Sequence, residues 1–478
     1  MAVRALKSMC AVLLQTALMA GTIVASGCMT VGPNYRAPTL DLKFIGHVQN
    51  APDIASLDTW WKSFNDPELN RIVARARDDN LDLAAAIARV TQSHAAAQAA
   101  GAKRLPSGEL GVQVDAEHQS LRSPIGELAS QQPGYNRDEN LYDEGIGASW
   151  EADLFGGLHR GEQAANAEAQ AAEAMHAGTR VTVTADAVDA YMQIRGNQER
   201  LRLAQQQIDV DTHLLSLIQQ RNQFGASSDR EVDRAQALVE QAKATVPPLE
   251  IALQAQLNRL DVLMGAQPGT YASELSTPTP IPVLPFINMS IEPQQLLRHR
   301  PDIMAAERHL AASNARIGMA ISDYYPHVSL GALLGFEGLG SDDLISAASF
   351  QPQLIAGLRW RLFDFGRVDA EVQQAKGAYA EALALYRQSA LRATEEIEDA
   401  LTSQGQYAKQ SDELDAEVAS LRLANTSSER SYQVGSISLT DVLDTEQQLL
   451  AAQDNAVSVR ISALRSGIFF YRAMGGGG

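Results

Sequence analysis

The sequence predicts a mixed α/β membrane protein in which one unit of long helical hairpins and β-strands occurs twice. Three observations support this fold class. A strand-to-helix junction repeats at a fixed spacing, four segments alternate apolar and polar residues, and two stretches of about 65 residues almost lack helix breakers. Alternation with a period of two indicates strands, whereas long runs without glycine or proline punctuation indicate helices.

The duplication is the strongest of these signals. Residues of the junction recur 210 positions later: Trp150 as Trp360, Phe155 as Phe365, and Gly156 as Gly366. Upstream, pairs such as Pro106 and Pro326 lie 220 positions apart, so the first copy holds an insertion between residues 111 and 150. A fixed offset of this kind indicates two copies of one supersecondary unit.

Charge and cysteine content exclude several classes of protein. The chain of 478 residues has a formal net charge of −18, and it lacks the basic patch that phosphate neutralisation requires, so nucleic acid is not an expected partner. The two cysteines are Cys10 and Cys28, both near the N-terminus. A disulfide framework or a thiolate metal site is therefore excluded from the rest of the chain.

The N-terminus predicts export. Residues 1–27 combine a basic start, a short apolar run and small residues, as in a signal peptide. Ala25-Ser26-Gly27-Cys28 resembles a lipoprotein-processing box, in which Cys28 receives diacylglycerol and an N-palmitoyl chain and becomes the mature N-terminus. The alternative is ordinary signal cleavage with Cys28 as a bystander. Met29, in the place where Asp retains bacterial lipoproteins at the inner membrane, favours outer-membrane sorting.

The mature chain is expected to divide into an extended arm, two repeats, a linker and a glycine tail. Their predicted bounds are 28–65 (arm), 66–266 (first repeat), 267–292 (Pro-rich linker), 293–474 (second repeat) and 475–478 (tail). In the first repeat we expect helices at 67–103, 156–221 and 228–264, with a kink or break at Pro247-Pro248, and strands at 110–117 and 144–154. In the second repeat we expect helices at 293–321, 366–430 and 439–474, and strands at 327–337 and 352–362.

Each predicted strand has one apolar and one polar face. In a bilayer only a closed barrel satisfies strand backbones, and Trp150 and Trp360 at equivalent strand ends suit an interfacial aromatic girdle. Four strands cannot close alone, so several copies must share a barrel, and three copies would supply twelve strands. The alternative is a soluble sheet whose apolar face packs against the helices.

Several motifs together point to one known family. They are Val31-Gly32-Pro33-Asn34-Tyr35, Trp60-Trp61, Asn80-Leu81-Asp82-Leu83, Arg300-Pro301-Asp302-Ile303, Tyr325-Pro326, Leu362-Phe363-Asp364-Phe365-Gly366-Arg367 and Met474-Gly475-Gly476-Gly477. Through them the chain resembles the TolC-like outer-membrane efflux proteins, specifically the NodT-type lipoprotein branch. The resemblance covers essentially the entire mature chain.

This resemblance implies a homotrimer with a 12-stranded outer-membrane β-barrel continued by a periplasmic α-barrel. It also implies a passive exit duct for small molecules that works with a periplasmic adaptor (membrane fusion protein) and an inner-membrane resistance-nodulation-division pump. A type I protein-secretion channel shares the fold and remains an alternative. A lipid-anchored periplasmic scaffold that forms no pore is the alternative from another class.

Two candidate sites follow from the resemblance. The helix-tip turns Phe224-Gly225-Ala226 and Val434-Gly435-Ser436 are similar to the family's adaptor-docking tips; the alternative is a plain hairpin turn. Asp441 and Asp444, one helical turn apart, are similar to the family's periplasmic gate, and an acidic ring of this kind favours cations. The alternative is a solvated helix face. Their counterparts in the first repeat are Glu231 and Arg234, so ion pairs at the tip are expected.

No enzymatic chemistry is expected. The nine histidines lack metalloprotease spacing, and neither a nucleophile motif nor a phosphate-binding loop is present. His299 and His309 lie ten positions apart on one predicted helix, but this spacing alone is weak evidence for a metal. We therefore predict neither catalytic nor metal-binding residues, and no cofactor apart from the lipid on Cys28.

Overall fold

The computed structural model describes residues 30–39, 57–283, 299–341 and 345–477. The predictions for the signal peptide, Cys28, arm residues 40–56, linker residues 284–292 and helix residues 293–298 lie outside these ranges. The elements of the first repeat are η1 (Trp60–Phe64), α3 (Pro67–Asp79), α4 (Leu81–Ala102), β1 (Ser107–His118), α5 (Pro124–Ala129), β2 (Asp138–Ala152), α6 (Gly157–Gln223) and α7 (Asp229–Leu263). Those of the second are α9 (Pro301–Ser322), β3 (His327–Gly338), β4 (Phe350–Arg359), α10 (Arg367–Gln433) and α11 (Leu439–Ala473).

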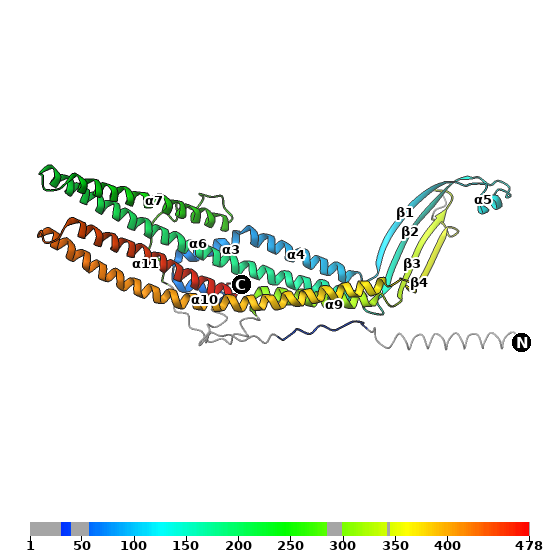
Figure 1. Ribbon diagram of the computed structural model, residues 1–478. Helices are drawn as coiled ribbons and strands as arrows, with labels where there is room; N and C mark the ends of the chain where they lie inside the picture. Colours follow the sequence, from blue (N-terminus) through cyan, green and yellow to red (C-terminus); the bar gives the residue numbers. More distant parts are fainter. Residues whose placement is uncertain (1–29, 40–56, 284–298, 342–344, 478) are drawn as a thin grey trace. The chain divides into compact units, whose positions relative to one another are not determined.

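The duplication is present in the structure with the same offsets as in the sequence. Helices α10 and α11 begin and end 210 residues after α6 and α7, while α9 and β3 begin and end 220 residues after α4 and β1. The offset changes within the hairpin between β1 and β2, which contains the extra helix α5 (Figure 1). The predicted insertion therefore forms a short helix at the end of the first hairpin.

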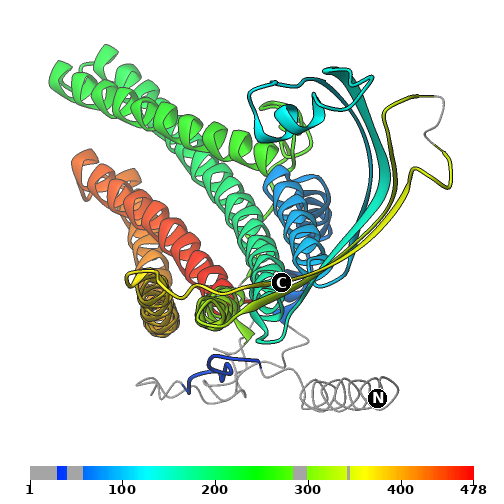
Figure 2. The same cartoon turned by 90° about the vertical axis from the view of Figure 1, so that its right-hand side faces the viewer.

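The four strands form one antiparallel sheet in the order β1-β2-β3-β4 (Figure 1). Residues such as Leu110, Ile146 and Leu334 lie opposite one another across the first three strands, and the sheet is curved (Figure 2). Every residue of β1 is exposed, including its alternating apolar residues. The alternative of a soluble sheet whose apolar face is covered by helices is therefore wrong for this strand. Within the described residues, β1 and β4 each have a strand partner on one side only.

The chain divides into two compact units that cut across the two repeats. One unit comprises the described residues of 1–38, 91–170 and 307–384, and it contains the sheet. The other comprises the described residues of 39–90, 171–306 and 385–478, and it contains α3, α7, α11 and the larger parts of α6 and α10. Among the described helices, none has both the length and the apolar character that a membrane crossing requires.

The second unit has an aromatic core that involves two of the family motifs. Trp60 stacks on Tyr471 with ring centroids 4.7 Å apart, and both are buried. Arg300, also buried, donates to the Ala473 carbonyl (2.6 Å) and pairs with Glu396 (2.7 Å). A buried guanidinium needs such partners because an unpaired charge is costly away from water. These contacts hold α10 and the end of α11 to the start of α9.

The predicted helix at 67–103 is in fact two helices, α3 and α4. Asn80 has extended backbone angles (φ −67°, ψ 128°), and its Oδ1 accepts from the backbone N–H groups of Asp82 and Leu83 at 2.9 and 3.1 Å. Its Nδ2 donates to the Leu263 carbonyl at 2.9 Å. Asn80 therefore caps α4 and ties it to α7, which explains the break.

Two further predictions need correction. The predicted break at Pro247-Pro248 is wrong, because helix α7 continues through both prolines; a kink there stays a prediction. Buried Ala242 and Leu249 hold the helix on both sides of the prolines. The arm is not extended to residue 65, because Trp60–Phe64 forms the 3₁₀ helix η1. Burial of the aromatic side chains of η1 outweighs the extended preference of this segment.

Candidate functional site

The two helix-tip turns have the same backbone structure. Gly225, between α6 and α7, has φ +71°, and Gly435, between α10 and α11, has φ +78°. The backbone N–H groups of Ala226 and Ser436 donate to the carbonyl five residues earlier, at 2.8 and 2.9 Å. This pattern closes each long helix around a left-handed residue, a conformation that favours glycine.

Both turns present an open surface. A Cβ atom added at Gly225 or Gly435 would meet no atom within 4 Å. The preceding side chains, Phe224 and Val434, are 88% and 80% exposed. Each tip therefore combines an exposed apolar side chain with accessible glycine backbone, an arrangement suited to helix-end contacts with another protein.

A capping box fixes the helix that follows each tip. Asp441 accepts hydrogen bonds from the backbone N–H and the hydroxyl of Ser438 at 3.0 and 2.8 Å, and Glu231 bonds Ser228 in the same way. These bonds lower the pKa of both carboxyl groups. The Asp441 carboxylate thus caps α11, so the structure supplies a structural role for one of the two predicted gate residues.

The other predicted gate residue, Asp444, faces the first repeat. Its Oδ1 lies 3.5 Å from Nη2 of Arg234, and both side chains are 54% exposed. The two residues are 210 positions apart, so they occupy equivalent places on α11 and α7. The expected ion pair at the tip is therefore confirmed for Asp444. Beneath it, an apolar cluster joins α6, α7 and α11: Leu215, Ile218, Ala235, Val239, Leu439 and Leu443.

A buried acidic residue that no sequence pattern indicates lies below the tip. Glu446 of α11 is only 9% exposed, and burial, followed by the charges of Asp211 and Glu429, raises its pKa to about 7. Burial also raises the pKa of Asp211 on α6. No basic side chain in the described part of the chain pairs with Glu446. The weak amphipathicity of these long helices conceals which carboxyl groups they bury.

The strand-to-helix junctions are held by aspartate caps. Asp153 accepts from the backbone N–H groups of Leu158 and His159 at 3.1 and 2.7 Å. Asp364 does the same for Gly366 and Val368 at 3.1 and 3.0 Å. These carboxylates satisfy N–H groups that the first turn of a helix leaves unpaired. The repeated junction motif is therefore a helix-capping motif.

The two junction tryptophans also make equivalent contacts. Trp150 Nε1 donates to the Arg104 carbonyl (2.8 Å), and Trp360 Nε1 donates to the Tyr324 carbonyl (3.0 Å). Trp360 lies just after β4, which ends at Arg359, so its predicted place inside the strand is wrong. Both indoles tie the end of a hairpin to the turn that precedes it. Their role at a membrane interface remains a prediction.

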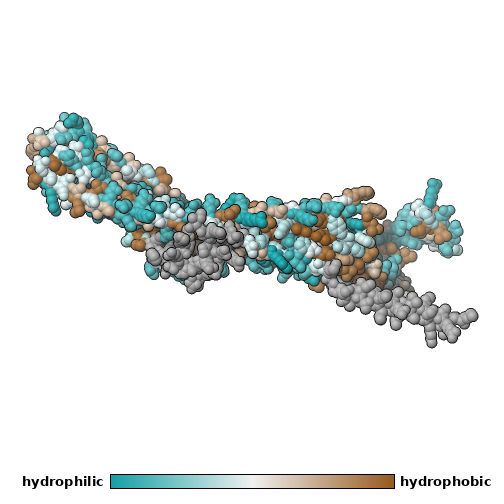
Figure 3. Space-filling model, turned by 60° about the horizontal axis from the view of Figure 1, so that its bottom comes forward, coloured by the Kyte–Doolittle hydropathy of each residue, from teal (hydrophilic) through white to brown (hydrophobic). Residues whose placement is uncertain are grey.

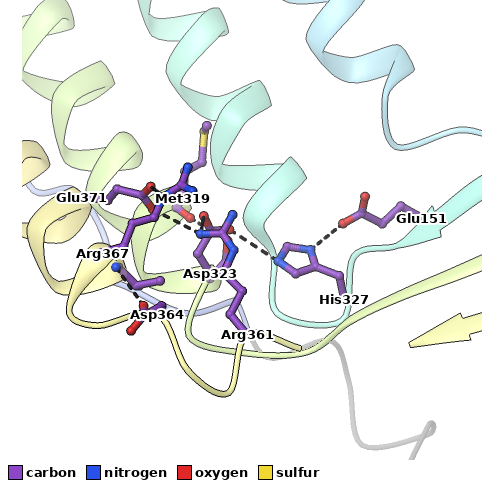
Figure 4. Close-up of polar contacts among 10 residues, drawn as sticks. Glu151, Met319, Asp323, His327, Arg361, Asp364, Arg367 and Glu371 are labelled. Carbon is purple, nitrogen blue, oxygen red and sulfur yellow. Dashed lines mark hydrogen bonds and ion pairs between the residues drawn. The ribbon is translucent and has the colours of Figure 1, made fainter. Parts of the chain in front are cut away.

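A charged network joins the strands to the helices at this junction (Figure 4). His327 Nδ1 lies 2.7 Å from Glu151, and its Nε2 lies 3.4 Å from Asp323. Arg361 bridges Asp323 and Glu371 at 3.4 Å each. The network borders a cavity of about 860 Å³. It links β2, β3 and α10 to the turn after α9 and to the residues after β4, which sequence spacing alone does not bring together.

The motif at residues 31–35 lies along α6 and α9. Arg160 is buried and donates to the carbonyls of Val31 (3.1 Å) and Gly32 (3.2 Å) and to the side chain of Asn34 (3.0 Å). Asn314 of α9 donates to the carbonyl of Pro33 at 3.0 Å. Gly32 has φ +88° and packs against Gly318, where a Cβ would come within 2.4 Å of backbone. This fit explains the Val-Gly-Pro-Asn-Tyr motif.

Replacing Arg160 is expected to release the arm. The Arg160→Ala variant loses three hydrogen bonds from a buried charge, a local cost on the order of 3 kcal/mol. Limited proteolysis should then cut the arm at least about tenfold faster. The exposed Arg202 of the same helix pairs with Glu199, so Arg202→Ala is the matched control. Equal cleavage rates in both variants would contradict this role.

The described residues offer no assembled metal site. No group of three or more His, Cys, Asp or Glu side chains in the described part of the chain is placed to hold an ion. His309 instead contacts Glu168 at 2.8 Å. The features of the candidate site are therefore the exposed surfaces of the two tips and the helix caps at the tips and at the strand-to-helix junctions.

Comparison with known proteins agrees with this picture. The family described as Outer membrane efflux protein matches residues 72–266 and 293–476. The chain is 31% identical to the pyoverdine export outer membrane protein OpmQ of Pseudomonas putida, over 98% of this chain and 97% of that one. It is 30% identical to nodulation protein T of Rhizobium leguminosarum bv. viciae, over 90% and 87%. The solved outer-membrane channel OprN is 31% identical with a TM-score of 0.82, over 93% and 99% of the two chains.

Proposed function

The chain belongs to the outer membrane efflux protein family and is the outer-membrane exit duct of a tripartite efflux system, and we propose that it works as a lipid-anchored homotrimer. The observation that carries the proposal is the open sheet, in which β1 and β4 lack a second strand partner among the described residues. Four strands are too few for a barrel, since the smallest membrane barrels have about eight. Three copies supply twelve strands and pair each β4 with β1 of the next copy.

The cargo is a small molecule that passes without chemical change. OpmQ, named for pyoverdine export, supports a small molecule over a polypeptide. The resemblance to the NodT-type branch supports a resistance-nodulation-division pump in the inner membrane as the energy source. Selection of the cargo then belongs to the pump, and the duct contributes a water-filled path.

The lipid anchor is Cys28. This assignment rests on the processing box and on the contacts of the described residues that follow it. The Val31 N–H donates to the Phe155 carbonyl at 3.0 Å, directly at the strand-to-helix junction. Three residues span at most about 10 Å, so a lipid at Cys28 suits a chain whose sheet belongs to the outer membrane.

The helix tips are the adaptor-docking surface. Their two matching glycine turns and exposed apolar residues support this role. Each copy supplies two tips, so a trimer offers six similar sites to the hairpin tips of a periplasmic adaptor. Docking through backbone and small side chains favours glycine at the turn, because a large side chain would hold the partner away.

The Arg234–Asp444 pair holds the duct closed. An exposed ion pair contributes about 0–1 kcal/mol, so Asp444→Ala is expected to raise the open probability by up to about fivefold. Single-channel recordings of the purified trimer measure this directly. Arg234→Ala should have the same effect, and the exchanged pair Arg234→Asp/Asp444→Arg should restore the closed state. An unchanged open probability in both single variants would exclude this gate.

Capture of the partner tests the proposed assembly. A photo-crosslinking residue at position 434 should trap a periplasmic adaptor in living cells, identified by mass spectrometry. The same residue at position 423, an exposed helix position, serves as the control. Equal capture at both positions, or no adaptor at either, would contradict docking through the tips.

A further inference from the structure

The second strand-to-helix junction contains an aromatic residue that this chain leaves bare. Phe365 is 102% exposed and has φ +52°, a conformation that residues with a Cβ rarely adopt. No atom lies within 4 Å of the Cβ position of the next residue, Gly366. The segment 362–365 also exposes Leu362 and Phe363, and apolar surface gathers near the strand end of the helices (Figure 3).

The equivalent residue of the first repeat is covered. Phe155 stacks on Tyr325, with ring centroids 4.5 Å apart and an interplanar angle of 17°. Its neighbour Gly156 packs against Thr30. Phe155 belongs to the junction before α6, whereas Tyr325 belongs to the turn between α9 and β3. The first repeat therefore uses this aromatic residue to bind the second repeat.

The duplication indicates which residue corresponds to Tyr325 as a partner for Phe365. Tyr325 lies 220 residues after Leu105, which occupies the equivalent turn between α4 and β1. Leu105 is apolar and 65% exposed. In the sheet, β1 and β4 lie at opposite edges, so in a closed barrel β4 of one copy meets β1 of the next copy. The turn before β1 that comes next to Phe365 then belongs to that next copy.

We propose that Phe365 of one copy packs on Leu105 of the next copy and closes the seam between them. This contact repeats, between chains, the Phe155–Tyr325 contact within each chain. It rests on the homotrimer proposed above and adds the residues that join its subunits at the level where strands meet helices.

The two kinds of seam differ in chemistry, which gives Phe365 its importance. Within the chain, α6 and α9 are joined by the arm and by polar contacts, such as Glu168 with Arg316 at 2.7 Å. The equivalent positions that would face each other between copies carry alanine: Ala370 corresponds to Arg160, Ala378 to Glu168, and Ala96 to Arg316. Ala96, Ala370 and Ala378 are exposed in the single chain. The seam between copies therefore depends on apolar packing, where an aromatic anchor contributes most.

Cysteine pairs test the contact. The natural chain has no cysteine after Cys28, so introduced thiols report one contact each. Under oxidation, Phe365→Cys/Leu105→Cys should give dimers and trimers on a non-reducing denaturing gel, and reductant should reverse them. The matched control Phe155→Cys/Tyr325→Cys should crosslink within one chain and stay at monomer mass. Each variant with a single introduced cysteine should run at monomer mass on the same denaturing gel.

The outcomes separate this contact from the trimer itself. Native mass of the unaltered protein in detergent establishes the copy number independently, and a monomer there would overturn the proposed function. A trimer without crosslinks between chains, or with position 365 labelled by a membrane-soluble thiol reagent, would overturn the Phe365 contact alone. If the cysteine pair fails to assemble, Phe365→Ala is compared with Phe363→Ala. The first should lower the dissociation temperature of the trimer more, and equal temperatures would reject the contact.

Discussion

The Gly435→Glu variant is expected to lose export completely while still folding and assembling. Position 435 lies in a left-handed turn with open space around its Cβ position, so the new side chain extends into the surface that we assign to the adaptor. The conformational strain of about 1–2 kcal/mol is small beside the stability of a helical hairpin of this length. Cellular resistance to an exported compound, with trimer mass as a second readout, measures the effect.

Two controls separate docking from strain. Gly435→Asn introduces a residue that tolerates the left-handed conformation, so this variant should retain part of the export activity. Gly405→Glu places the same charge at an exposed position of the same helix, α10, with no neighbour within 4 Å, and it should export normally. Normal export by Gly435→Glu would reject docking at this tip.

The Glu446→Gln variant is expected to be more stable than the natural protein at pH 8 and equally stable near pH 5. In the fold the Glu446 carboxyl keeps its proton up to about pH 7, against 4.5 for an ordinary Glu. The folded state therefore binds more protons in this window, and stability falls as pH rises from 4.5 through 7. Each pKa unit corresponds to about 1.4 kcal/mol, so the total change is roughly 3 kcal/mol.

Thermal unfolding followed by circular dichroism between pH 4.5 and 8 measures this difference. The unfolding temperature of the natural protein should fall across the window, and that of Glu446→Gln should fall less. Some slope should persist, because burial raises the pKa of Asp211 in the same direction. Glu413→Gln, at an exposed position of α10, should behave like the natural protein. Parallel curves for all three proteins would show that Glu446 does not carry the pH dependence.

The sequence predicts the repeated elements well because their signals are local. Glycine at positions 225 and 435 marks the tips, and alternation marks the strands. The break at Asn80 was missed although its cap on α4 is local, because the bond that ties Asn80 to α7 is distant: its amide binds the Leu263 carbonyl, 183 residues away. For the same reason, the continuity of α7 through Pro247 depends on packing that no local pattern reveals.

The candidate sites also differ in whether their signals are visible in the sequence or depend on the folded chain. The tips follow from the family resemblance and occur in both repeats, and the Arg234–Asp444 pair follows from comparing the two repeats, so both are predictable from the sequence. Phe365 and Leu105 also lie in repeated motifs, yet their exposure is visible only in the folded chain. The His327 network and buried Glu446 join side chains from several helices and strands, and neither spacing nor composition anticipates such groupings.

One measurement addresses the central claim, that copies of this chain jointly build a pore across the outer membrane. The full-length protein, purified in detergent, is weighed by light scattering and then added to planar lipid bilayers under voltage. We expect a particle with three chains and discrete, repeatable current steps. A single-chain particle that carries no current would show that the open sheet is not part of a shared barrel.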